Sequence, residues 1–117
     1  MQINLISDTV TKPTLGMLDF MLNARVGDDV FEDDPSVNAL QEKMAGMFGM
    51  EDALFVPSGT MSNQVAIKTH TQPGDQVICS EQSHIYRYEG GGIAMNSGAS
   101  VKLLPGDSGL LTANQVA

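Results

Sequence analysis

The sequence predicts an α/β fold in which short buried strands alternate with helices. Two apolar runs of strand length, Ala53–Val56 and Gln76–Cys79, flank a stretch with helical spacing, and a third run follows at Ser100–Leu104. A strand, a helix and a second strand at this spacing fit a right-handed crossover between parallel strands. The chain has 117 residues, of which 42% are hydrophobic, enough for one ordinary domain with a core.

The first part of the chain predicts an extended arm, a helix, an acidic loop and a second helix. In residues 1–13, Ile3 and Leu5 alternate with polar residues, and the polar run from Ser7 to Lys12 ends at Pro13. From Pro13 to Ala24 the apolar residues recur every three or four positions, which predicts an amphipathic helix with the proline in its first turn. Carboxylates and turn formers fill residues 27–35. A second helix is predicted from Val37 to Phe48, with Gly49 as its stop.

The remaining elements complete the α/β pattern. A helix is predicted from Met61 to His70, between the first two apolar runs, followed by a turn at residues 71–75. A short helix is expected from Ser83, interrupted by the three glycines at 90–92. The last helix, residues 113–116, has Thr112 as its expected cap.

Net charge and cysteine content narrow the classes of function. Lys and Arg number 6 against 14 Asp and Glu, which gives a net charge of −8. Such a chain offers no basic face for nucleic acid or an anionic membrane surface, and no apolar run is long enough to span a bilayer. The single cysteine, Cys79, cannot form an internal disulfide and is expected to be a small buried residue. We therefore expect a soluble protein of the reducing cytoplasm.

A phosphate site is suggested by Ser58-Gly59-Thr60, which lies between a predicted strand and a predicted helix. Unpaired N–H groups and the positive end of the helix dipole converge at such a place. Glycine lets an anion approach the backbone, and the hydroxyls add donors. Neither GxxxxGK[ST] nor GxGxxG is present, so a smaller phosphorylated cofactor is favoured. The alternative, commoner for an isolated motif, is a hydroxyl that only caps the helix.

His84 is a candidate for chemistry because it follows the predicted strand that ends at Cys79. The carboxyl ends of parallel strands meet at one edge of a sheet, where ligands gather, so His84 and Ser58 are expected in one crevice. An imidazole there can stack on a flat ring or move a proton near neutral pH. A surface or helix-capping histidine is the alternative. Arg87 and Glu89 are interpreted as a surface pair, although their nearness to His84 keeps them of interest.

The acidic loop supports a weaker hypothesis, a module that binds a hard cation such as calcium or magnesium. Its carboxylates are Asp28, Asp29, Glu32, Asp33 and Asp34. The spacing and the late glutamate of an EF-hand are missing, so a solvated charge cluster is favoured and no metal site is predicted.

Five motifs occur in one order and at one spacing along the chain. They are Ser7–Thr14, Val26–Val30, Asp34–Asn38, Phe55–Gln64 and Ser83–Ile85. Together they are far more specific than any one of them. With these motifs the chain closely resembles the N-terminal third of the low-specificity L-threonine aldolases, in the β-eliminating lyase group. The resemblance runs from about Ile3 to the last residue.

The resemblance implies a pyridoxal-phosphate enzyme of fold type I, with the aspartate-aminotransferase-like architecture. Residues 1–35 would form an N-terminal arm, helix and acidic loop, and residues 36–117 the start of the α/β cofactor-binding domain. The assembly would be a homodimer or homotetramer with active sites between subunits.

The resemblance also implies roles for particular residues. Ser58, Gly59 and Thr60 would bind the cofactor phosphate. His84 would stack on the pyridine ring and assist catalysis, and Ser7 would lie near the carboxylate of a small amino acid substrate.

The chain departs from the family pattern in places. Ile6 stands where family members commonly have Arg, and Phe31-Glu32 replaces a Tyr-Gly pair, which bears on substrate preference. The family's Schiff-base lysine lies beyond Ala117, and the lysines present match none of its contexts: Lys12, Lys43, Lys68 and Lys102. We therefore expect this chain to be the N-terminal part of a longer parent and inactive by itself.

Two hypotheses of function follow. In the first, the parent is a lyase that cleaves L-threonine, L-allo-threonine and related β-hydroxy-α-amino acids to glycine and an aldehyde, with His84 as the base for the β-hydroxyl proton. In the second, the chain is a non-catalytic truncated fragment or paralogue that keeps only the phosphate-binding and assembly elements.

Overall fold

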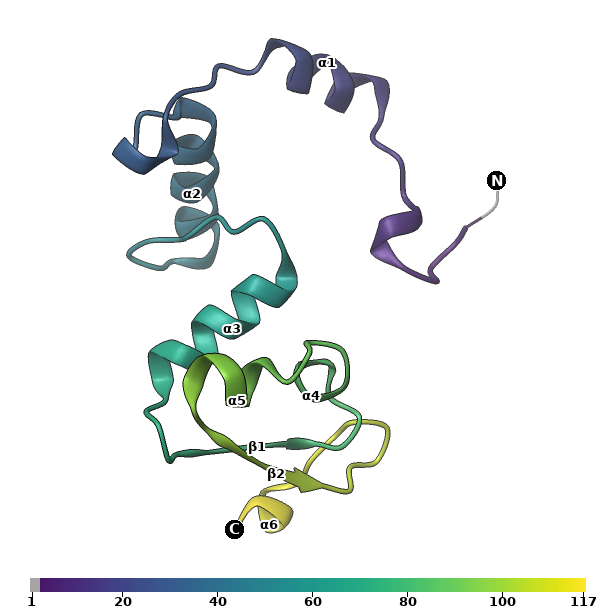
Figure 1. The fold of residues 1–117 in the computed structure, drawn as a ribbon. Coiled ribbons are helices and arrows are strands. Elements are labelled where there is room, and N and C mark those ends of the chain that lie inside the picture. Colours follow the sequence, from purple (N-terminus) through teal and green to yellow (C-terminus); the bar gives the residue numbers. More distant parts are fainter. Residues whose placement is uncertain (1–2) are drawn as a thin grey trace. The chain divides into compact units, whose positions relative to one another are not determined.

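The chain folds into two compact units, Met1–Phe55 and Val56–Ala117. The computed structural model describes residues 3–117 (Figure 1). The first unit is built from helices: the short 3-10 helices η1 (Asp8–Val10) and η2 (Asp29–Phe31), and the α-helices α1 (Leu15–Asn23) and α2 (Pro35–Phe48). The second unit combines helices with a sheet.

Helix α1 begins at Leu15, two residues later than the predicted start at Pro13. The Thr14 hydroxyl accepts the N–H of Met17 at 3.3 Å, and the sulfur of Met17 accepts the N–H of Thr14 at 3.4 Å. Thr14 is therefore the N-cap, and the prediction that places Pro13 in the first turn is wrong. The predicted apolar stripe exists, but α1 buries none of its residues. Its large exposed side chains are Leu15, Met17, Leu18, Phe20, Met21 and Leu22.

Helix α2 is confirmed, with a start two residues earlier than predicted. Asp34 caps it: Oδ1 accepts the N–H groups of Ser36 at 2.9 Å and Val37 at 3.0 Å, while Oδ2 accepts that of Gly27 at 3.1 Å. A proline at the first helical position loses no hydrogen bond, so the helix starts directly after this carboxylate. It ends at Phe48, and the predicted stop Gly49 follows as the C-cap with a left-handed φ of 64°.

The predicted strand Ala53–Val56 is wrong, and with it the strand-helix-strand unit that was to end at Cys79. The segment is irregular. The N–H of Phe55 donates to the side-chain oxygen of Gln41 at 2.8 Å, so a backbone group that a neighbouring strand would need is bonded to α2. Leu54 is 70% exposed. Among the described residues, no strand pairs with this run.

The second unit confirms the α/β class, and its two strands are the runs predicted at Gln76–Cys79 and Ser100–Leu104. β1 (Gln76–Ser80) and β2 (Ser100–Leu104) are parallel, with Gln76 opposite Ser100 and Ser80 opposite Leu104. The crossover between them carries the helices α4 (His84–Arg87) and α5 (Gly92–Ser97). The predicted break after the first of these helices is confirmed, because Gly90 and Gly91, both with positive φ, follow it. Gly92 is already the first residue of α5, a helix that was not predicted. The helix α6 (Ala113–Val116) follows the sheet.

The core of the second unit lies around α5. This helix packs against α3 (Gly59–His70), α4 and β2 (Figure 1). Ile93 is 2% exposed, and Ala99 and Cys79 are also buried, which confirms the expectation for the cysteine. Within residues 3–117, no helix has the length and apolarity needed to cross a membrane.

We expect the N-cap of α2 to be a main determinant of stability in the first unit. Asp34→Ala removes all three hydrogen bonds, whereas Asp34→Asn keeps an oxygen for Ser36 and Val37 and loses the acceptor for Gly27. The urea midpoint, followed by circular dichroism, is predicted to fall in the order wild type, Asn, Ala. Equal midpoints for all three proteins would contradict this role.

The same cap sets an acid dependence. The N–H groups of Val37, Gly27 and Ser36 lower the pKa of Asp34 against the opposing effect of desolvation. A lowered pKa in the folded state stabilises the fold fully above the ordinary value of 3.8, and this contribution is lost as the pH falls through the lower folded value. The difference in unfolding free energy between wild type and Asp34→Ala, measured by urea unfolding at a series of pH values, is therefore expected to shrink as the pH falls below 3.8.

Candidate functional site

The predicted phosphate motif forms the start of α3. Ser58 is the N-cap, with extended backbone, and its hydroxyl accepts the N–H of Met61 at 3.1 Å. The helix therefore begins at Gly59, two residues before the predicted start. The capping role, which the sequence left as the alternative for this motif, is real for Ser58.

The backbone in front of this helix start is open. A Cβ built on Gly59 meets no atom of the described residues within 4 Å, apart from its neighbours in the chain and its own helix, so the backbone is accessible at this position. Thr60, the next residue, adds a hydroxyl in the first turn. Open N–H groups at a positive helix end, beside a glycine and a hydroxyl, fit a phosphate group.

His84 begins α4, shortly after β1 ends, so its predicted place beyond the carboxyl end of a strand is confirmed. Its Nδ1 lies 3.0 Å from Oε1 of Glu89, while its side chain is 63% exposed. The ring of Tyr88 lies 5.4 Å away between centroids, at an angle of 47°. The imidazole is thus held on one side and open to a ligand on the other.

Glu89 is the buried centre of the site, and the interpretation of Arg87 and Glu89 as a surface pair is wrong. The Glu89 side chain has no exposed surface. The amide of Asn63 donates to Oε1 at 2.7 Å and that of Gln64 donates to Oε2 at 2.5 Å. Arg87 turns instead to the carbonyl of Glu81, at 2.9 Å.

The donors around Glu89 favour its charged form. Desolvation raises the pKa of this carboxyl, but the hydrogen bonds from Asn63, Gln64 and His84, together with the charge of His84, outweigh it and leave the pKa below its ordinary value. A buried carboxylate with this many donors stays ionised at neutral pH and accepts hydrogen bonds only.

Glu89 brings the two predicted parts of the site together. Asn63 lies in the first turns of α3, just after Thr60, and shares Oε1 of Glu89 with His84. The start of α3 and the imidazole therefore meet on one carboxylate. Ser58 does not follow a strand as predicted, so the sheet edge alone does not explain this juxtaposition.

Ser7 belongs to the first unit, whereas His84 and α3 belong to the second. Its hydroxyl lies 3.0 Å from that of Thr9 and accepts the N–H of Thr9 at 3.3 Å. Its predicted place near a substrate carboxylate stays a prediction.

The acidic loop gathers no metal site. Across residues 3–117, no group of three or more His, Cys, Asp or Glu side chains is placed to hold a metal ion. The loop carboxylates serve local structure instead: Asp28 caps η2 by accepting the N–H of Val30 at 3.0 Å, and Asp34 caps α2.

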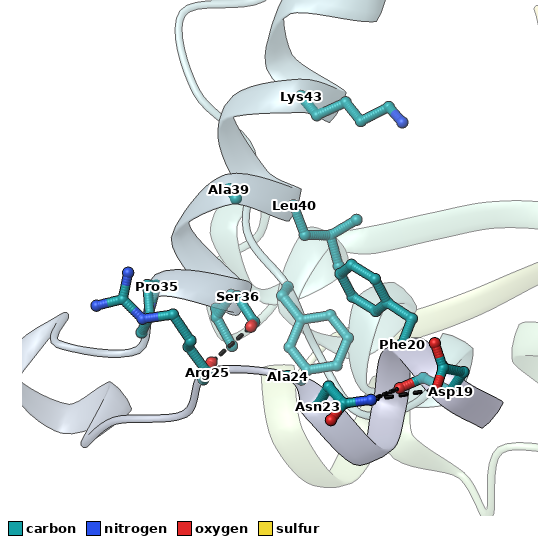
Figure 2. A pocket seen from close by; sticks show the side chains of 12 residues that line it. Asp19, Phe20, Asn23, Ala24, Arg25, Pro35, Ser36, Ala39, Leu40 and Lys43 are labelled. Atoms are coloured by element: carbon teal, nitrogen blue, oxygen red, sulfur yellow. Dashed lines mark hydrogen bonds between the residues drawn. The ribbon is translucent and has the colours of Figure 1, made fainter. Parts of the chain in front are cut away.

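The first unit contains an open groove of about 870 Å³ between α1 and the start of α2. Figure 2 shows Phe20 beside Leu40 in this groove. Two hydrogen bonds join residues that line the groove. The Ser36 hydroxyl donates to the main-chain carbonyl of Arg25 at 2.6 Å, and the side-chain amide of Asn23 donates to the main-chain carbonyl of Asp19 at 2.9 Å. None of the predicted site residues lines it.

Sequence reasoning missed Glu89, Asn63 and Gln64 as members of the site. A signal for them was present, because two adjacent amides follow Ser58-Gly59-Thr60 within two helical turns and a glutamate follows His84 before three glycines. Gly92, the last of these three glycines, lies against the Gln64 side chain. A Cβ there would overlap the amide end of the Gln64 side chain, so a larger residue would displace the amide that reaches Glu89.

The second unit thus combines a parallel strand pair with a helix start linked, through Glu89, to an exposed histidine. The family model described as Beta-eliminating lyase matches residues 4–117, and the chain belongs to this family. The resemblance found in the five motifs is thereby confirmed.

Curated relatives point to one activity within the family. The chain is 48% identical over 93 residues to the low specificity L-threonine aldolase of Escherichia coli, an alignment that covers 80% of this chain and 28% of that protein. It is 48% identical over 101 residues to low-specificity L-threonine aldolase 1 of Arabidopsis thaliana, covering 86% and 28%. For the low specificity L-threonine aldolase of Saccharomyces cerevisiae the identity is 39%, covering 97% and 30%. The chain thus spans less than a third of these relatives.

The chain is also similar to a solved structure. The chain is similar to a putative aromatic amino acid beta-eliminating lyase/threonine aldolase from Exiguobacterium sp. 255-15, with a TM-score of 0.65 and 25% identity. The match covers 90% of this chain and 31% of that one.

Gly92→Ala is predicted to destabilise the second unit by displacing the Gln64 amide. The loss leaves one oxygen of a buried carboxylate without its donor, which costs about 1 to 3 kcal/mol. Gly59→Ala is the matched control, because a methyl group there meets open space.

A double-mutant cycle identifies the mechanism. If Gly92→Ala acts through Gln64, it is expected to lower the free energy of unfolding only slightly in a protein that already carries Gln64→Ala. Denaturant unfolding measures this free energy. Additive costs would show that the methyl group acts by another route.

Proposed function

We propose that this chain is the N-terminal part of a pyridoxal-phosphate-dependent lyase of fold type I. The proposed reaction cleaves L-threonine, L-allo-threonine and related β-hydroxy-α-amino acids to glycine and an aldehyde. The observation that carries the proposal is the link through Glu89 between the start of α3 and an exposed His84. Its support from sequence is the 48% identity to an L-threonine aldolase over 80% of the chain.

The start of α3 is the proposed cradle for the cofactor phosphate. The N–H groups at the helix start and the hydroxyls of Ser58 and Thr60 are the donors, and Gly59 leaves the backbone accessible. When bound, the cofactor supplies a pyridine ring that takes up the electron pair released as the Cα–Cβ bond of the substrate breaks.

His84 has two proposed tasks. Its exposed ring faces the pyridine ring and orients it, and its Nε2 accepts the proton of the β-hydroxyl as the aldehyde forms. Nε2 is the nitrogen available for this step, since Nδ1 is engaged by Glu89. Ser7 is the proposed contact for the substrate carboxylate.

Assembly as a homodimer or homotetramer is part of the proposal. An isolated nine-residue helix is marginal in water, and α1 exposes large apolar side chains such as Leu15 and Leu22. A subunit contact that covers this face would stabilise it. The free thiol of the buried Cys79 favours a reducing compartment, and we propose the cytoplasm.

The phosphate cradle is tested with Ser58→Ala combined with Thr60→Val in the full-length protein. Loss of two hydroxyl donors to a charged phosphate is expected to weaken cofactor binding by at most about 3 kcal/mol, because the backbone N–H groups remain. Equilibrium dialysis of the cofactor-free protein gives the Kd. An unchanged Kd would mean that the hydroxyls only cap α3.

The two tasks of His84 are separated by two substitutions in the full-length protein. His84→Phe keeps an aromatic face, so cofactor affinity is expected to stay near that of the wild type while threonine cleavage falls by about 10²- to 10⁴-fold. His84→Asn is expected to weaken cofactor retention as well. Glycine release from threonine measures the rate, and turnover by His84→Phe within about threefold of wild type would exclude His84 as the base.

A further inference from the structure

We propose that Glu89 is a positioning residue that fixes His84 as the Nδ1–H tautomer and thereby makes Nε2 the basic nitrogen of the site. The inference rests on the proposed function for its consequence in catalysis. Its structural part concerns this chain alone and is tested separately.

The first step is the direction of the hydrogen bonds around Glu89. The Gln64 amide is oriented by Asn96, whose Nδ2 donates to Oε1 of Gln64 at 3.2 Å. The nitrogen of Gln64 therefore faces Glu89, and it donates to Oε2. Asn63 donates to Oε1 from the same helix. Both carboxylate oxygens are already acceptors before His84 is considered.

The second step follows for the imidazole. A carboxylate that accepts from two amides has only lone pairs to offer His84, and Nδ1 lies 3.0 Å from Oε1. Nδ1 must therefore carry a proton. In the neutral ring the other nitrogen, Nε2, then holds the lone pair. Among residues 3–117, the structure gives Nε2 no hydrogen-bond partner, and the side chain is 63% exposed.

The third step is the consequence for the reaction. A base needs its lone pair directed at the proton it accepts, and a ring that exchanges its two tautomers offers that lone pair only part of the time. With Nδ1–H held by a carboxylate that has no exposed surface, the ring keeps both its tautomer and its orientation. Glu89 thus acts through His84 rather than on the substrate.

The chain offers a direct test, because it contains only two histidines. With ¹⁵N-labelled histidine, long-range ¹H–¹⁵N NMR distinguishes a protonated from an unprotonated ring nitrogen. The spectra are recorded at alkaline pH, and the ¹⁵N shifts of the two ring nitrogens identify the neutral rings. We expect His84 as the Nδ1–H form. His70, for which the described residues provide no ring partner, is the internal reference and is expected to favour Nε2–H. A His84 ring that is mainly Nε2–H would overturn the inference, and this result needs no variant.

Glu89→Ala is expected to shift the His84 tautomers toward those of His70, whereas Glu81→Ala, which removes an exposed carboxylate nearby, leaves them unchanged. In the full-length protein Glu89→Ala is expected to lower kcat by about 10²-fold, the lower end of a general-base contribution. Added to His84→Phe, it is expected to cause no further loss. A full additional loss would show that Glu89 acts independently of His84. Absence of threonine cleavage in the wild type would refute the proposed function, while the tautomer result would still decide the role of Glu89.

Discussion

The buried carboxylate of Glu89 is the interaction on which the second unit and its site depend. Its two oxygens accept from Asn63 and Gln64 on α3 and contact His84 on α4. A carboxylate without exposed surface is costly unless its lone pairs are satisfied, so these contacts are required once Glu89 is inside. Because the partners come from different helices, satisfying one buried charge also sets the place of the imidazole relative to the start of α3.

Other features of the second unit make room for this carboxylate. Gly92 admits the Gln64 amide where a methyl group would overlap it, and Asn96 on α5 orients that amide. The parallel pair β1 and β2 carries α4 and α5 in its crossover, so the histidine, the glutamate and the glycine all lie on one connection. The sheet therefore supplies the frame, while polar contacts supply the local geometry.

Local signals in the sequence predicted much of the fold. Gly49 stops α2 and Thr112 precedes α6 as expected, because caps and stops depend on neighbouring residues alone. Asp34 was predicted as a loop residue. It is in fact the N-cap of α2, a role that also depends on neighbouring residues alone. Ala53–Val56 failed for the opposite reason: a strand needs a partner, and here Gln41 takes the backbone N–H of Phe55. His84 and Ser58–Thr60 were found by type and position, whereas Glu89 was missed because its burial depends on amides 25 and 26 residues away.

The most direct measurement is a crystal structure of the full-length protein with pyridoxal phosphate bound. The account predicts the phosphate at the start of α3, in contact with Ser58, Gly59 and Thr60. It predicts the imidazole of His84 against the pyridine ring, with Nδ1 still bonded to Glu89. A phosphate held at another helix, or a His84 ring turned away from the cofactor with Glu89 released, would contradict it.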